Sequence, residues 1–147
     1  MKNQVFITLI GAFCLVLVSK FAYSQDQIQP KKYDNPQWKR IVAVDYKPGK
    51  YGRAKEIIYS YYRKAAEKAG TQPPQTIELQ TGEWDVLYIW NLEDGIETLD
   101  WEVSPNSIAW RKALNEIMGG EEKAAEIIKE YQSTVARSEN NIGRALD

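Results

Sequence analysis

The chain has 147 residues with 19 basic and 20 acidic side chains, and this near balance offers no strongly basic surface for nucleic acid. It contains one cysteine, Cys14, and no histidine, which excludes an internal disulfide, Ser-His-Asp catalysis and most zinc sites. Any catalysis would have to use carboxylates, Tyr, Lys, Arg or a bound group. We predict neither a cofactor nor a metal site.

The first 24 residues predict a cleavable export signal. Lys2 is followed by an apolar run from Val5 to Val18 and by small residues at positions 22 and 24. The run is too short to cross a hydrocarbon core of roughly 30 Å. Lipid attachment at Cys14 is disfavoured, because the apolar run continues beyond that residue. The end of the segment, Ala-Tyr-Ser-Gln, resembles export signals of Bacteroidota. We expect a periplasmic or secreted protein that has no membrane span after cleavage.

Cleavage of the first 24 of 147 residues leaves 123 residues, which fits one domain. Residues 25–37 are polar, contain Pro30 and Pro36 and show no periodicity, which predicts a flexible leader. A single domain is then expected over residues 38–147.

The first elements of this domain are a strand and a helix. Residues 39–47 include the apolar, β-branched run Ile41–Val44 and are followed by Pro48-Gly49, which predicts a strand. From residue 51 to 69, apolar side chains recur every three or four positions until Gly70, which predicts a helix.

The second half predicts a hairpin and two more helices. Residues 76–81 alternate in polarity and residues 84–92 are mostly apolar, which favours an antiparallel hairpin. Ser104 is expected to cap a helix that ends at Gly119-Gly120, and another helix starts at Glu121. Residues 133–144 either extend this last helix or form a fourth edge strand.

This order predicts an α+β fold, a ferredoxin-like sandwich (β-α-β-β-α-α) whose antiparallel sheet carries its helices on one face. We expect the aliphatic side of the sheet to pack beneath the helices. The other side is aromatic and partly polar, and we interpret it as an uncovered surface for binding or dimerisation. Its residues are Val42, Val44, Tyr46, Glu78, Gln80, Val86, Tyr88 and Trp90.

The strand end Tyr46-Lys47-Pro48-Gly49, the hairpin Gly82-Glu83-Trp84-Asp85 and the two later helices resemble the dimeric α/β-barrel superfamily. That group includes proteins similar to NIPSNAP and to antibiotic-biosynthesis monooxygenases, and the resemblance covers roughly residues 38–135. It implies a homodimer in which two sheets close face to face around a small organic ligand. Members with haem or metal activity often use a histidine, which this chain lacks.

Five residues are the predicted ligand-binding set: Tyr46, Glu78, Tyr88, Trp90 and Arg111. The aromatic rings would form apolar walls, and Arg111 would contact an anion from the helix side. Glu78 is the best catalytic candidate, because a carboxylate against aromatic surface can have a raised pKa and transfer protons. The favoured alternative is that Glu78 sits on an exposed strand or pairs with Arg or Lys across the dimer. Asp45 and Asp85 are expected to cap loops or to pair with Arg40 or Arg53.

The leading functional hypothesis is an exported protein that binds a small organic molecule. One alternative is a cofactor-independent, oxygenase-like enzyme that uses Glu78 or a tyrosine as its acid-base group. Another is an accessory protein for polysaccharide capture or degradation, in which Trp84 and Trp101 stack on sugar rings. The acidic stretch from residue 93 to 102 lacks the ligand spacing of a calcium loop, so it is interpreted as a solvated turn.

Overall fold

The structure, a computed structural model, describes residues 28–146. The chain divides into two units, Met1–Asp34 and Asn35–Asp147, and the described part of the first contains no helix or strand. The predicted export signal, residues 1–24, lies outside the described residues. Within residues 28–146, no helix is both long and apolar enough to cross a bilayer.

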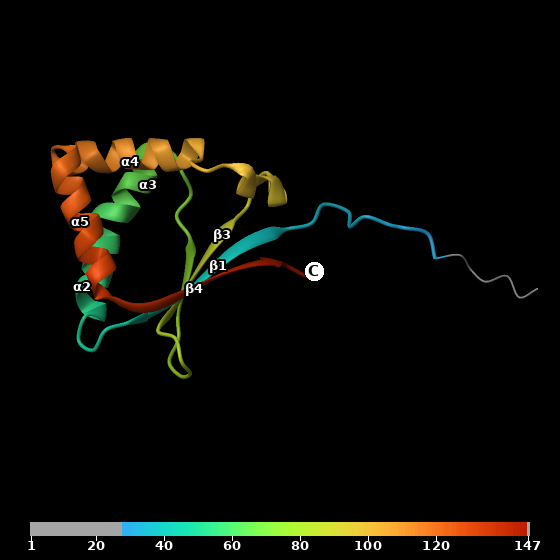
Figure 1. The fold of residues 1–147 in the computed structure, drawn as a ribbon, viewed down its shortest axis with the longest axis horizontal. Helices are drawn as coiled ribbons and strands as arrows, with labels where there is room; N and C mark the ends of the chain where they lie inside the picture. Colours follow the sequence, from blue (N-terminus) through green and yellow to red (C-terminus); the bar gives the residue numbers. More distant parts are fainter. Residues whose placement is uncertain (1–27, 147) are drawn as a thin grey trace, which may run out of the picture. The chain divides into compact units, whose positions relative to one another are not determined.

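Four antiparallel strands form one sheet in the order β2-β3-β1-β4 (Figure 1). Their bounds are Trp38–Tyr46 (β1), Gln75–Glu78 (β2), Val86–Asn91 (β3) and Val135–Arg144 (β4). β1 pairs with β3 from Lys39↔Asn91 to Val44↔Val86. The strand order and the intervening helices are those of a ferredoxin-like sandwich, which confirms the predicted fold class.

The segment at residues 133–144, for which the sequence left two alternatives open, forms the edge strand β4 from residue 135 onward. It pairs with β1 from Trp38↔Arg144 to Tyr46↔Val135, with an irregularity at Asp45/Tyr46. The centre of β4, residues 138–141, reads Ser-Glu-Asn-Asn and has low intrinsic strand preference. Pairing with the whole length of β1 therefore stabilises this strand more than its own propensity does.

The helices agree with the predicted elements. α2 (Tyr51–Ile57), the π-helical turn η2 (Ile58–Tyr62) and α3 (Arg63–Ala69) run on continuously, and Gly70 ends α3 with a left-handed φ of 67°. After β3 come a 3-10 helix, η3 (Gly95–Asp100), and then α4 (Pro105–Met118) and α5 (Glu121–Thr134). The Ser104 hydroxyl caps α4 by accepting a hydrogen bond from the Ser107 N–H at 3.2 Å.

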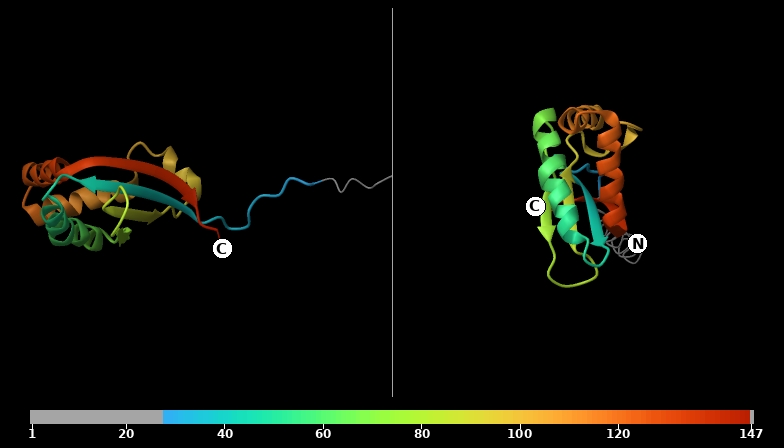
Figure 2. Two further views of the ribbon diagram at one scale, coloured as in Figure 1. Left: turned by 90° about the horizontal axis from the view of Figure 1, so that it is seen from below. Right: turned by 90° about the vertical axis from the view of Figure 1, so that its left-hand side faces the viewer.

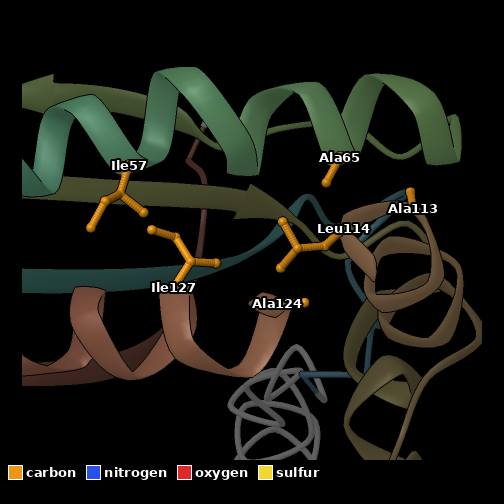
Figure 3. Packing of buried hydrophobic residues seen from close by; sticks show 6 residues of the cluster. All are labelled: Ile57, Ala65, Ala113, Leu114, Ala124 and Ile127. Atoms are coloured by element: carbon orange, nitrogen blue, oxygen red, sulfur yellow. The ribbon is translucent and has the colours of Figure 1, made fainter. Parts of the chain in front are cut away.

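The helices pack on one another through a core of small and aliphatic side chains. α2–α3 and α5 lie side by side in front of the strands in the right-hand view of Figure 2. α4 lies at one end of them and runs crosswise to both, as Figure 1 shows. Figure 3 shows Ile57 of α2 and Ile127 of α5 pointing toward each other. The small residues let the helix backbones approach closely. The buried members are Ile57, Ala65, Ala113, Leu114, Ala124 and Ile127.

A second core lies between helices and sheet, and it corrects the predicted assignment of the sheet faces. Its buried members are Val44, Tyr46, Ala54, Val86 and Tyr88. Ala54 belongs to α2, and Tyr131 of α5 packs on the same cluster, so the helices cover the aromatic face. The prediction that this face is uncovered is wrong. Large rings bury more apolar area than aliphatic side chains do, which favours them on the covered side.

The uncovered side of the sheet is the aliphatic one. Strand pairing places Ile77, Leu87 and Ala43 in one row across three strands, and Ile89 beside Ile41 in the next. None of these residues belongs to either helix-packed core. Ile77 is 39% exposed, Ile41, Leu87 and Ile89 are half-buried, and the small side chain of Ala43 is buried among its neighbours. We call these five residues the open sheet face.

Candidate functional site

Three tyrosine hydroxyls meet between the sheet and the helices, and we call Tyr46, Tyr88 and Tyr131 the tyrosine cluster. The Tyr46 hydroxyl lies 2.8 Å from that of Tyr88 and 3.1 Å from that of Tyr131, so it shares a hydrogen bond with each. β1, β3 and α5 supply one ring each. Buried phenols find hydrogen-bond partners in this way because an unpaired buried hydroxyl is costly.

Further rings surround the cluster. Tyr51 of α2 stacks on Tyr46 with ring centroids 5.2 Å apart, and Trp90 of β3 lies 6.2 Å from Tyr88. On the far side Tyr62 of the π-helical turn lies 5.3 Å from Tyr131. Such contacts restrict how the three cluster rings can turn, so their hydroxyls are held in fixed positions.

Burial keeps these phenols protonated. It is the main cause that raises the pKa of Tyr46, Tyr88 and Tyr131 above that of a free tyrosine. At neutral pH the cluster therefore offers neutral hydroxyl groups that donate and accept hydrogen bonds. It does not offer a phenolate that would abstract a proton.

A small hollow opens from the cluster toward the β2 edge of the sheet, and we call it the tyrosine pocket. Its volume is about 30 Å³, which corresponds to roughly one water molecule. The helical side comes from positions 51, 55, 58, 59 and 63, and the sheet side from β2 and β3. The lining residues are Tyr51, Lys55, Ile58, Tyr59, Arg63, Thr76, Glu78 and Tyr88.

The π-helical turn shapes this pocket. Ile58 and Tyr59 lie in it, and Arg63 follows it directly. Such turns carry one residue more than an α-helical turn and often occur at functional sites. The Arg63 guanidinium lies over the Tyr59 ring at 4.4 Å, where it narrows the pocket mouth as an exposed cation–π pair.

Glu78 lies in this pocket, but not as a proton acceptor of raised pKa. Its carboxylate accepts a hydrogen bond from Lys55 Nζ at 3.1 Å and another from the Tyr51 hydroxyl. The Lys55 contact is the largest cause that lowers the pKa of Glu78. The expected raised pKa of Glu78 is wrong. The cation that pairs with Glu78 is Lys55 of the same chain, whereas the favoured alternative placed an Arg or Lys across the dimer. Since β2 is the sheet edge, Lys55 and water both reach this carboxylate.

The other predicted residues divide between two places. Trp90 packs on the tyrosine cluster as described, whereas Arg111 lies on α4 and lines a different hollow with Val103 and Ile108. The structure therefore groups Tyr46, Glu78, Tyr88 and Trp90 and separates Arg111 from them.

The two remaining carboxylates have structural partners. Asp85 accepts the Tyr46 backbone N–H at 2.8 Å, which confirms a capping role. Asp45 pairs with Arg137 at 3.3 Å, whereas Arg40 and Arg53 were the expected partners. Arg53 instead makes a two-point contact with Glu130 of α5. These contacts leave neither aspartate in the tyrosine pocket.

Sequence reasoning missed Tyr51, Lys55, Arg63 and Tyr131. A signal for three of them exists in the spacing, because positions 51, 55, 59 and 63 recur every four residues and carry rings and cations only. Within residues 28–146, no group of three or more carboxylate, cysteine or histidine side chains is placed to hold a metal ion. The site is thus a hydrogen-bonding, cation-rimmed aromatic pocket.

No family model and no curated protein matches this chain. Several solved structures match its fold, and two of them are described as NIPSNAP family proteins from Agrobacterium tumefaciens. One, of unknown function, has a TM-score of 0.52 and 12% identity and covers 79% of this chain and 94% of its own. The other has a TM-score of 0.53 and 15% identity and covers 81% and 94%. In fold, this chain is similar to NIPSNAP family proteins.

Proposed function

We propose that this protein binds a small, planar organic molecule in the tyrosine pocket and acts outside the cytoplasm. The supporting observation is the hydrogen-bonded cluster of three buried phenols beside a pocket lined by Arg63 and by the Lys55–Glu78 ion pair. Buried hydroxyl networks fix ligand orientation, and aromatic walls supply apolar contact. Because Glu78 already pairs with Lys55, Arg63 is the lining cation that favours a ligand with a carboxylate or another anionic oxygen.

Ligand entry requires the pocket to widen, because about 30 Å³ admits only water. Tyr59 is 51% exposed, and Arg63 contacts it from the same helix. Both side chains can turn outward into solvent without breaking the cores, so they form the movable wall.

The chemistry of the pocket favours binding over catalysis. A general base works best when its pKa lies near the operating pH. The pKa of Glu78 is lowered by Lys55, and the pKa of Tyr88 is raised by burial. Neither group approaches neutrality, so the oxygenase-like alternative gains no support from these residues.

The polysaccharide alternative has less support from the tryptophan rings. Arg137 lies over the Trp84 ring at 4.4 Å and occupies one of its faces. Trp101 is 56% exposed and lies in the segment between η3 and α4. No observation places the two rings on one binding surface.

The test is mass spectrometry of small molecules that the protein retains when it is purified from its native compartment. We expect one planar, oxygen-rich compound in wild type and its loss in Tyr51→Phe and Tyr88→Phe. Tyr61→Phe is the matched control, because Tyr61 packs on the helix core and does not line the pocket. Retention of the compound by both pocket variants would place the ligand elsewhere.

A further inference from the structure

α4 carries a second, larger hollow that is unrelated to the tyrosine pocket. It is open to solvent and has a volume of about 350 Å³, within the range of small-molecule sites. Five of its residues recur every three or four positions along α4, so one helix face forms its floor. The lining residues are Val103, Ser107, Ile108, Arg111, Lys112 and Asn115, and we call them the α4 hollow.

The apolar part of the hollow lies in water. Val103 is 57% exposed and Ile108 is 59% exposed, although the opposite face of α4 buries Ala113 and Leu114 completely or nearly so. α4 therefore has one face in the protein core and another that offers aliphatic surface to solvent. Exposed aliphatic surface beside a concave site often indicates a binding site.

The charged part of the hollow consists of two cations that form no direct ion pair. Arg111 and Lys112 form no ion pair or hydrogen bond with any described residue. The nearby carboxylate of Glu116 pairs directly with Lys68 at 3.0 Å and interacts with Lys112 only through space, without an ion-pair contact. The buried Oδ1 of Asn115 has no hydrogen-bond partner among the described residues either. Two cations and an unsatisfied amide are polar groups that a ligand or water would complete.

We propose that the α4 hollow binds a single-chain aliphatic carboxylate. The carboxylate would lie against Arg111 and Lys112, and the methylene chain along Val103 and Ile108. Charge selects an anion, because the hollow is lined by two positive and no negative side chains. The open shape of the hollow favours a narrow, flexible chain, which can lie along its floor and bury most of its apolar surface. A bulky ring system would leave most of its own apolar surface in water.

The test is an NMR titration of the ¹⁵N-labelled protein with octanoate and decanoate below their micelle-forming concentrations. Amide signals of α4 should shift. Decanoate should bind about four-fold more tightly than octanoate, because about half of each added methylene is buried on an open surface. Decyltrimethylammonium, which has the same chain and the opposite charge, should cause no such shifts.

Substitution of both cations isolates the charge contribution. R111Q/K112Q should weaken decanoate binding by about five-fold or more. The control K123Q/K129Q also removes two positive charges, from exposed positions on α5, and should leave decanoate binding unchanged. If the first variant does not fold, Ile108→Gln gives a second test, because it shortens the apolar contact and keeps both cations.

Three results would overturn the proposal. The first is equal binding of the ten-carbon cation and the ten-carbon anion, which would mean non-selective apolar contact. The second is equal weakening in the α4 and α5 charge variants. The third is a dimer that Ile108→Gln dissociates, which would mean that a second copy of the chain covers the hollow.

Discussion

The Tyr46 hydroxyl is central to the tyrosine cluster, because it shares hydrogen bonds with both other members. We predict that Tyr46→Phe lowers the free energy of unfolding by about 1–2 kcal/mol, since two buried hydroxyls lose a partner. Urea denaturation of wild type and variant measures this difference. Tyr61→Phe removes a hydroxyl outside the cluster and should cost clearly less. Equal losses in the two variants would mean that the cluster contributes no stability of its own.

A titration to alkaline pH tests whether the tyrosine hydroxyls are buried. Burial raises the pKa of five tyrosines in the folded state, namely Tyr46, Tyr51, Tyr62, Tyr88 and Tyr131. Their pKa is about 10 in the unfolded chain, so their stabilising effect is complete below about pH 10 and is lost as the pH rises further.

We therefore predict that these five phenols ionise together with unfolding. Absorbance of phenolate near 295 nm and far-UV circular dichroism, recorded in one alkaline titration, would follow both events. Part of the absorbance rise should coincide with the loss of helix signal. A complete absorbance change with intact circular dichroism would show that the cluster is accessible to hydroxide in the folded protein.

At the scale of elements, the π-helical turn is the feature most closely tied to the pocket. It adds one residue to an otherwise α-helical segment. We predict that deletion of Ser60 restores an ordinary α-helix, keeps cooperative unfolding and abolishes ligand retention, because Tyr59 and Arg63 then point elsewhere. Thermal unfolding and mass spectrometry measure the two effects.

A matched deletion in α5 serves as the control. Removal of the exposed Glu126 turns the following residues by about 100°, so that Ile127 and Tyr131 leave the cores. We expect that variant to lose cooperative unfolding. If the Ser60 deletion behaves in the same way, the π-helical turn is needed for folding and is not specific to the pocket.

Most elements could be predicted from the sequence because each carries a local signal. Ser104 and Gly70 mark helix ends, and periodicity marks the helix that begins at Tyr51. β4 could not be predicted in this way. Its polar centre has no strand signal, and it forms by pairing with a distant strand.

The sequence also could not predict which face of the sheet the helices cover. Val42 and Val44 alternate with Ile41 and Ala43, so both sides of β1 are apolar and period two alone favours neither. Four of the five predicted site residues nevertheless lie together. The pleat places Tyr46, Tyr88 and Trp90 on the same side of the sheet, and this does not depend on which side the helices cover. Arg111 was misplaced because α4 packs across the other helices at a distance from that pocket.

At the scale of the whole molecule, the open sheet face lacks a partner within the described residues. Ile41, Leu87 and Ile89 form its centre, on the side opposite the helix-packed tyrosines. Apolar sheet surface of this kind is stabilised by burial against another surface. We propose that a second copy of the chain covers it, so that the homodimer uses aliphatic contacts and each subunit keeps its own tyrosine pocket.

Ile89→Asp tests this arrangement, because it introduces a carboxylate at the centre of the proposed interface, where burial without a partner costs several kcal/mol. Wild type should sediment as a dimer at micromolar concentration and the variant as a folded monomer. Ala125→Asp adds the same charge to an exposed position on α5 and should remain dimeric. A monomeric wild type would mean that the open sheet face stays in contact with water, and ligand retention by the monomeric variant would show that the pocket functions within one subunit.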